Sequence, residues 1–221
     1  MNKYFNEEGS SIPVYDECDV LVVGGGAAGH SAAIAAARAG CKNVILMERY
    51  GYFGGDVTGG YVVMMPNLSW YNKSFVRGLQ EEWFTRLEKN APDSYMAPTL
   101  EEAGSSKPII VDKWKKVFSC TKGKPGEQVV MRSPNFDPQQ LKLELDAMVE
   151  ECPNVTMLLD CWGTKPIVED STIKGVIFES KAGRKAVYAK ICACFHEAFD
   201  AVGKYNIGIG HKYHGYGYIF S

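Results

Sequence analysis

The first fifty residues alternate between apolar runs and small residues in an order that predicts a βαβ unit. The run from Asp19 to Val23 is typical of a parallel strand covered on both faces. Three glycines follow, and the alanine-rich stretch 27–37 then favours a helix that Gly40 would end. A second apolar run over 43–48 predicts the next strand. We expect the two strands to be joined by the usual right-handed crossover.

The middle of the chain is less regular. Apolar residues at roughly helical spacing over 74–89 predict one helix. The prolines, glycines and lysines of 90–130 indicate a loop-rich excursion that is not part of the sheet. Asp137 followed by Pro138 is typical of a helix start, and predicts a helix that runs to Cys152.

Beyond residue 153 the pattern predicts strands. The run 155–159 indicates a short buried strand, and 167–170, 173–181 and 184–191 predict an antiparallel meander. The expected fold class is therefore α/β, a Rossmann-like domain with a parallel sheet, an antiparallel β-meander and a loop and helix excursion. The predicted organisation is a tail over 1–16, the Rossmann-like domain over 17–60 and 134–200, the excursion over 61–133 and an unassigned tail over 201–221.

Composition and charge narrow the class of protein. The 221 residues carry a formal net charge of -2, which gives no electrostatic reason to expect nucleic acid or an anionic membrane as a partner. The acidic, polar first twenty residues do not resemble a secretory signal, and no apolar run reaches the roughly eighteen residues that cross a bilayer. The seven cysteines form no CxxC pair, so reduced thiols are expected. These features predict a cytoplasmic protein.

The glycine turn carries the first chemical signature, Gly24-x-Gly26-x-x-Gly29, between a buried strand and a helix. Gly24 allows a tight turn, Gly26 lets the backbone approach a pyrophosphate, and Gly29 lets helix and strand pack closely. Free N–H groups at the helix start, at Ala27 and Ala28, and the positive end of the helix dipole would stabilise the phosphate charge.

Glu48 is the second signature, because an acid about twenty residues later is placed to accept hydrogen bonds from a ribose. The alternative interpretation is a tight strand–helix junction with a solvent-facing glutamate. Arg49 would either pair with a phosphate or be a surface residue. His30 would face either the phosphates or solvent. Nicotinamide and flavin dinucleotides share this fingerprint, so these residues alone leave the choice of cofactor open.

The segment ERYGYFGGDVTGG of residues 48–60 resembles the corresponding loop of fumarate-reductase-like and related FAD-dependent oxidoreductases, flavoproteins of the glutathione-reductase type. The segment NFDPQQLKLELDAM of residues 135–148 is similar to the same family, and the likeness covers about 17–191, thinning between 90 and 130. It implies FAD as cofactor and hydride transfer between the flavin and a small organic substrate. The resemblance also implies site residues: Gly24, Gly26 and Gly29 at the pyrophosphate, Glu48 at the ribose, Gly54, Gly55, Thr58 and Gly59 on the flavin side, and Gly163 at the adenine.

Two departures from this family leave alternatives open. A strand ending in a motif like DATGDGD is expected after the meander, but Ile191 is followed by CACFHE, and Asp200 to Gly203 is only a displaced echo. The chain is also shorter than the family members, so it is either a truncated or frame-altered relative, or a fragment whose active site a partner chain or a homo-oligomer would complete. The alternatives are a thiazole-synthase-like enzyme and a non-catalytic remnant of the flavoprotein fold. No metal site is predicted, because His196, His211 and His214 with Cys192 and Cys194 lack zinc spacing.

Overall fold

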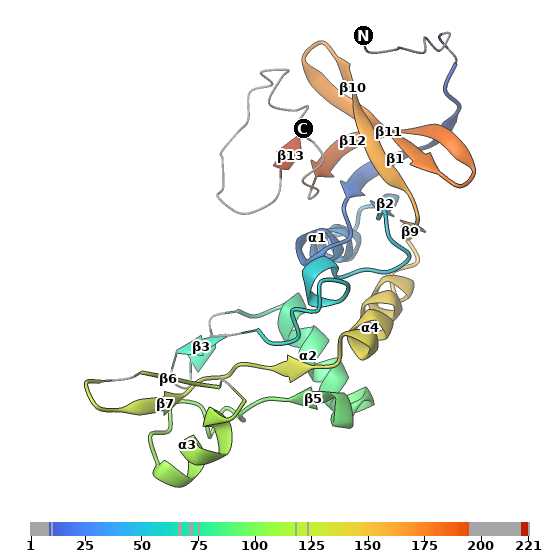
Figure 1. Ribbon diagram of the computed structural model, residues 1–221. Helices are drawn as coiled ribbons and strands as arrows, with labels where there is room; N and C mark the ends of the chain where they lie inside the picture. Colours follow the sequence, from blue (N-terminus) through green and yellow to red (C-terminus); the bar gives the residue numbers. More distant parts are fainter. Residues whose placement is uncertain are drawn as a thin grey trace, which may run out of the picture.

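A mostly parallel sheet with layers on both faces forms the centre of the protein in a computed structural model (Figure 1). The structure describes residues 9, 11–65, 68–70, 73–74, 76–117, 119–122, 124–194 and 218–220. The sheet has the order β10-β11-β12-β1-β2-β9, and β13 pairs with β12. Its strands are β1 (Val14–Val23), β2 (Val44–Met47), β9 (Val155–Leu158), β10 (Trp162–Glu169), β11 (Thr172–Ser180), β12 (Gly183–Cys194) and β13 (Tyr218–Phe220).

The parallel part of the sheet follows from the predicted βαβ unit. Strand β1 pairs in parallel with β2, and β2 pairs in parallel with β9. Val20 and Val22 pack into the core beneath helix α1 (Ala27–Arg38), whereas Leu21 and Val23 pack into the core beneath the meander. Because both faces are covered, every residue of this run can be apolar, as the sequence indicated.

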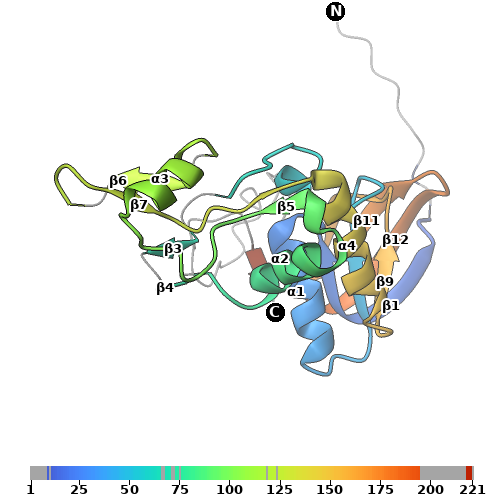
Figure 2. The same ribbon diagram turned by 90° about the horizontal axis from the view of Figure 1, so that it is seen from below.

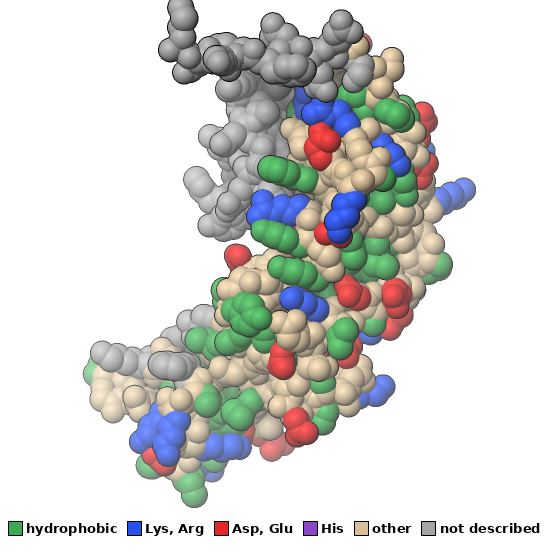
Figure 3. Space-filling model, turned by 45° about the vertical axis from the view of Figure 1, so that its right-hand side comes forward, with side chains coloured by type: hydrophobic (Ala, Val, Ile, Leu, Met, Phe, Trp, Pro, Cys, Tyr) green, Lys and Arg blue, Asp and Glu red, His purple; other side chains and the backbone are tan. Residues whose placement is uncertain are grey.

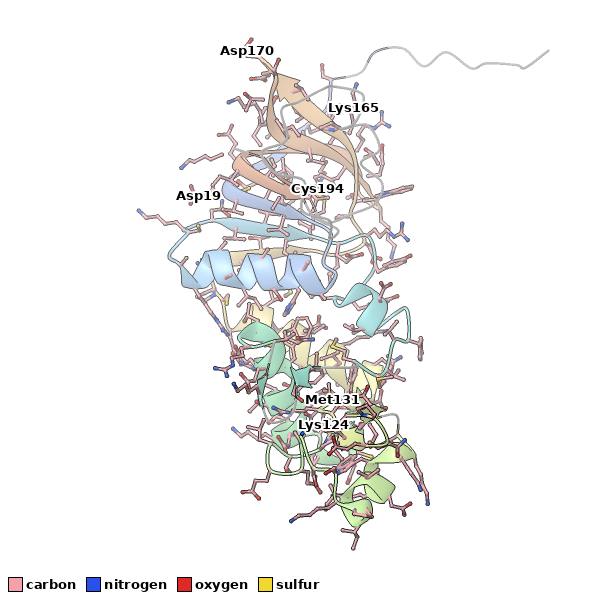
Figure 4. All side chains as sticks on the ribbon, turned by 90° about the vertical axis from the view of Figure 1, so that its left-hand side faces the viewer. Asp19, Lys124, Met131, Lys165, Asp170 and Cys194 are labelled. Carbon is pink, nitrogen blue, oxygen red and sulfur yellow. The ribbon has the colours of Figure 1, made fainter. Side chains whose placement is uncertain are left out.

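The antiparallel meander is confirmed, with β10 paired to β11 and β11 paired to β12. Its last strand differs from the prediction, because β12 continues past Ile191 to Cys194. From Ala186 to Cys194, β12 lies parallel to β1, with Val20 opposite Ile191 and Val23 opposite Cys194. Figure 4 shows Asp19 and Cys194 at opposite ends of this parallel region. One strand therefore closes the meander and extends the parallel sheet.

Helices α2 (Leu79–Asn90) and α4 (Pro138–Glu150) lie beyond α1 on the same side of the sheet (Figures 1 and 2). The start of α4 is as predicted, with the Asp137 carboxylate accepting a hydrogen bond from the Gln139 N–H at 2.7 Å. Helix α2 begins at Leu79 rather than at Ser74. Gly78, the residue before it, has a positive φ of 77°, which is not helical, so the helix cannot extend toward Ser74. The side chains predicted to face inward are largely buried: Trp83, Phe84 and Leu87 in α2, and Leu141, Leu145, Met148 and Val149 in α4.

The excursion projects away from the sheet (Figures 1 and 2). It contains a helix that the sequence analysis did not predict, α3, whose Val111 and Trp114 pack with Val130 in a small core of their own. Lysine and arginine side chains gather near its far end (Figure 3). Besides α2, the elements of this region are β3 (Ser69–Trp70), β4 (Lys73–Ser74), the 3-10 helix η2 (Pro92–Ser94), β5 (Tyr95–Met96), α3 (Pro108–Lys115), β6 (Cys120–Lys122) and β7 (Gln128–Val130). Strand β8 (Asn135–Phe136), which pairs with β5, follows it in the sequence.

Three remaining predictions concern membrane-spanning helices, the state of the cysteines and the residues beyond β12. Within the described residues, the helices are too short or too polar to traverse a bilayer. All seven cysteines are free thiols. The displaced echo at 200–203 and the three histidines at 196, 211 and 214 lie outside the described residues.

Candidate functional site

The predicted site lies at the carboxyl end of the parallel strands, where the glycine turn after β1 meets the loop that follows β2. The Gly24 N–H donates to the Met47 carbonyl at 2.8 Å, which joins the ends of the two strands. The Gly54 N–H donates to the Gly25 carbonyl at 2.8 Å, and Gly26 and Gly54 form a parallel bridge. The short 3-10 helix η1 (Gly55–Val57) follows this bridge, at the same end of the sheet as Cys194 (Figure 4). The structure therefore brings the two glycine-rich segments into direct contact.

Each glycine of the motif has a different physical reason to be glycine. Gly24 adopts a φ of 100°, a conformation that other residues rarely adopt. A Cβ on Gly29 would overlap the Gly24 carbonyl oxygen, so the helix can approach the turn only without a side chain there. A Cβ on Gly26 would meet no protein atom within 4 Å. Gly26 therefore borders open space, which is the requirement for close approach of a phosphate.

The start of α1 is suited to an anion. The N–H groups of Ala27, Ala28 and Gly29 have no acceptor within the helix because they belong to its first turn. The N-cap residue Gly26 provides no side-chain acceptor, and the first turn contains no acidic residue. These donors and the positive end of the helix dipole thus remain available to a bound phosphate.

Glu48 lies beside the glycine turn, with only 6% of its surface exposed. One carboxylate oxygen accepts a hydrogen bond from the Gly25 N–H at 2.6 Å, and the other accepts one from the Tyr50 N–H at 2.9 Å. The solvent-facing glutamate of the alternative interpretation is therefore excluded. A carboxylate oxygen can accept more than one hydrogen bond, so Glu48 retains acceptor capacity for hydroxyl groups of a ligand.

The loop after β2 presents backbone at the turn and buries the side chains of Phe53, Val57 and Thr58. Gly54 and Gly55 have φ values of 106° and 57°, and a Cβ on Gly55 would lie 3.2 Å from the Gly26 Cα. Thr58 is fully buried and its hydroxyl donates to the Phe53 carbonyl at 2.6 Å, so it maintains the loop conformation. A Cβ on Gly59 would overlap the Tyr52 ring.

Arg49 and Gly163 lie to either side of this centre. Arg49 is exposed, and its guanidinium lies 4.5 Å from the centroid of the Tyr50 ring. The Tyr50 ring stacks on Tyr52. Gly163 in β10 packs closely on the end of β1, because a Cβ there would lie 2.8 Å from Val23 Cγ1. Neither residue contacts the glycine turn directly through the interactions described above.

His30 corrects the sequence analysis, since it faces neither phosphates nor solvent. Its ring is fully buried, and Nε2 lies 3.0 Å from the Leu145 carbonyl oxygen in α4. Its ring centroid lies 5.6 Å from that of Trp83 and 6.0 Å from that of Phe53. Burial lowers the pKa of His30 to about 4, so the ring is neutral at ordinary pH and is expected to donate from Nε2 to Leu145. Helical periodicity of the residues in 27–37 was the signal that could have placed it on the inner face.

Two further residues of the site were missed. Gly25 falls on a variable position of the glycine motif, yet its N–H binds Glu48 and a Cβ there would overlap the ring of Phe53. Phe53 is fully buried beneath the turn. The run of three consecutive glycines was the available signal, because the motif itself requires only the first and third of them.

The site thus combines an open glycine turn, unpaired helix N–H groups and a fixed carboxylate, an arrangement that can bind a diphosphate joined to a sugar. Among the described residues, there is no group of three or more His, Cys, Asp or Glu side chains that could hold a metal ion.

Comparison with known proteins agrees with this geometry. The model of the family described as FAD dependent oxidoreductase matches residues 19–193. Urocanate reductase from Eggerthella lenta is 48% identical over 58 residues, which cover 26% of this chain and 9% of that protein. A 4-oxocyclohex-2-ene-1-carboxylate 5-dehydrogenase from Sinomonas cyclohexanicum is 37% identical over 101 residues, or 45% of this chain and 16% of that protein. The chain therefore aligns with only a small part of these relatives.

Two solved structures share the fold. A flavocytochrome c3 fumarate reductase in an open conformation aligns with a TM-score of 0.50 and 19% identity, over 82% of this chain and 34% of that one. The p-nitrophenol 4-monooxygenase of Pseudomonas putida aligns with a TM-score of 0.50 and 14% identity, over 85% of this chain and 42% of that one.

Proposed function

The chain belongs to the FAD-dependent oxidoreductases, and from this premise we propose that it binds FAD at the glycine turn for hydride exchange with a small organic substrate. The observation that carries this proposal is the open space at Gly26 beside the buried carboxylate of Glu48. When bound, the flavin would supply the redox chemistry, and the protein would supply binding, orientation and electrostatics.

The backbone of the turn would hold the diphosphate. Gly24, Gly26 and Gly29 leave room for its approach, and the N–H groups of Ala27 and Ala28 would donate to its phosphate oxygens. Glu48 would accept hydrogen bonds from the hydroxyls of the adenosine ribose, since its position is already fixed by the Gly25 and Tyr50 N–H groups. Arg49 has no acidic partner among the interactions described for it, which leaves its charge available to a phosphate.

The loop after β2 would approach the flavin side through its backbone. Gly54 and Gly55 contact the turn, and their positive φ values and close neighbours, Thr58 beside Gly54 and Gly26 beside Gly55, keep the loop backbone against it. Thr58 and Gly59 would act indirectly, because they fix the loop through Phe53 and Tyr52. Gly163 would lie near the adenine through the backbone of β10, as the resemblance implied.

The wider setting of the reaction is also a proposal. We further propose that a partner chain or a second copy contributes a substrate-binding part of the active site; the chain spans 9% and 16% of the length of the two relatives it matches. A cytoplasmic location is supported by seven free thiols, which reducing compartments maintain. Neither nucleic acid nor a membrane is proposed as a partner.

The test compares Gly26→Val with Gly9→Val in the full chain. A Cβ at either position would meet no protein atom within 4 Å, so both variants should fold, with a loss of less than about 1 kcal/mol at the helix cap. We expect Gly26→Val to weaken FAD binding about a hundredfold or more, because the methyl groups keep the phosphate from the backbone N–H donors. Gly9→Val should bind FAD as the parent does.

FAD binding is measured by the change in flavin fluorescence on titration and by visible flavin absorbance of the purified protein. Glu48→Gln should weaken binding by about tenfold, because the amide NH2 cannot accept from one of the two backbone N–H groups that hold the side chain, and the remaining oxygen offers a ribose hydroxyl only a neutral acceptor. If the folded parent protein does not bind FAD, the result would instead support the non-catalytic remnant of the flavoprotein fold. If Gly26→Val binds FAD as tightly as the parent does, the assigned site is refuted.

A further inference from the structure

A cavity lies on the meander side of the sheet, with a volume of about 300 Å³. It is formed between the turn that joins β9 to β10 and the turn that joins β11 to β12, which lie on the same side of the molecule in Figure 1. Tyr15 of β1 completes its wall. The volume is at the lower end of the range for small-molecule sites.

The floor of this cavity is apolar and includes aromatic rings. Phe178 and Leu158 are almost completely buried, at 2% and 8% exposure. The Tyr15 ring meets the Phe178 ring edge to face, with centroids 6.1 Å apart. Such a surface suits a flat apolar ring, because aromatic groups gain from edge-to-face and offset contacts.

The rim carries more positive than negative charge. Lys181 lies 3.3 Å from the Asp160 carboxylate, an exposed ion pair that water already weakens. The Lys185 ammonium is 5.5 Å from the centroid of the Tyr15 ring, and both residues line the cavity. Two ammonium groups against one carboxylate favour a ligand with a negative charge at its outer end.

This cavity is separate from the cofactor site. Its lining consists of residues of 158–161, 178–185 and Tyr15, and none of these is among the residues assigned to the cofactor, which are Gly163 and residues of 24–29, 48–49 and 54–59. Gly163, assigned to the adenine end, pairs with Phe178, so the cavity adjoins that end of the cofactor site. The two are neighbours through the backbone, because the Cys161 N–H donates to the Glu48 carbonyl at 2.9 Å. The side-chain carboxylate of Glu48, which is assigned to the cofactor, faces the glycine turn and not the cavity lining.

We propose that this cavity binds a small planar organic anion of the aromatic carboxylate class, with the ring on the Tyr15–Phe178 floor and the carboxylate at Lys185 and Lys181. The site is distinct from the proposed dinucleotide site and does not depend on it. Binding requires both parts of the ligand, since the floor recognises the ring and the rim recognises the charge.

The experiment titrates benzoate into the full-length isotope-labelled protein and follows backbone amide resonances by NMR. We expect shifts concentrated in residues 158–161 and 178–185. Lys185→Met should weaken benzoate binding about tenfold, the loss of one charge-assisted contact. Lys174→Met is the matched control, because it removes a lysine from exposed β11 surface outside the cavity and should leave the affinity unchanged. Benzamide, which is uncharged, should bind about tenfold more weakly than benzoate.

Three outcomes would overturn the proposal: no benzoate shifts in the cavity, equal effects of the two lysine variants, or equal binding of benzamide. Displacement of benzoate by FAD would also overturn it, since the cavity would then belong to the dinucleotide site. The Gly26→Val variant distinguishes the two proposals, because it should weaken FAD binding about a hundredfold or more and leave benzoate binding unchanged. Failure of FAD binding in the parent, with benzoate bound, would leave this proposal standing.

Discussion

Replacing Glu82 by Gln should destabilise the fold, because Glu82 is the centre of an ion network that joins three helices. The Arg38 guanidinium of α1 donates to both Glu82 oxygens, at 2.7 and 2.9 Å. Arg86, one turn later in α2, donates to Glu82 at 2.9 Å and also to Glu151 at the end of α4. The network therefore fixes α2 against the Rossmann-like core.

The magnitude follows from the pKa. The two arginines lower the pKa of Glu82 from 4.5 to about 2, and at about 1.4 kcal/mol per pKa unit this would be worth about 3 kcal/mol. The Glu82 side chain is 29% exposed, so water screens the pairs and we reduce the value to about 1–2 kcal/mol. Glu82→Gln should lower the free energy of unfolding by that amount at neutral pH.

The pH dependence has a definite sign. Since the pKa of Glu82 is lower in the folded than in the unfolded protein, its contribution is complete above pH 4.5 and is lost as the pH falls toward about 2. Urea unfolding of parent and variant at pH 7 and at about pH 3 measures the difference. The gap should narrow on acidification. Glu88→Gln removes an exposed charge from the same helix as a control. The reasoning would be contradicted if Glu82→Gln lowered the free energy of unfolding no more than Glu88→Gln does, or if its effect were the same at both pH values.

Three further predictions concern buried positions. Gly29→Ala should lower the free energy of unfolding by about 2–4 kcal/mol and the thermal midpoint with it, because the new Cβ overlaps the Gly24 carbonyl oxygen. Gly26→Ala, whose Cβ meets no protein atom, should leave the midpoint unchanged. Equal melting curves of the two variants would contradict this prediction. His30 should show no protonation by NMR between about pH 5 and 8, since burial lowers its pKa to about 4; a midpoint near the ordinary value would place the ring in water. Cys192 should resist alkylation by iodoacetamide in the native protein at about pH 8, because it is buried and burial raises its pKa to about 12. The partly buried Cys41 should be alkylated under the same conditions. Mass spectrometry of both cysteines before and after unfolding measures the difference.

The sequence alone determined the features that depend on neighbouring residues. Local pattern and backbone preference account for the β1–turn–α1 unit, the capped start of α4 at Asp137 and the antiparallel strands of the meander. The roles of Gly24 and Gly29 were also predictable, because the conformations that exclude a side chain are set by a turn only six residues long.

Tertiary contacts decided the rest. Leu145 and Trp83, distant in sequence, bury His30; Phe53 makes Gly25 indispensable; and pairing with β1 carries β12 on to Cys194. Each of these depends on a residue that the chain brings close only after folding. Local propensity cannot specify such a contact, since the free energy that selects it comes from packing between segments distant in the sequence.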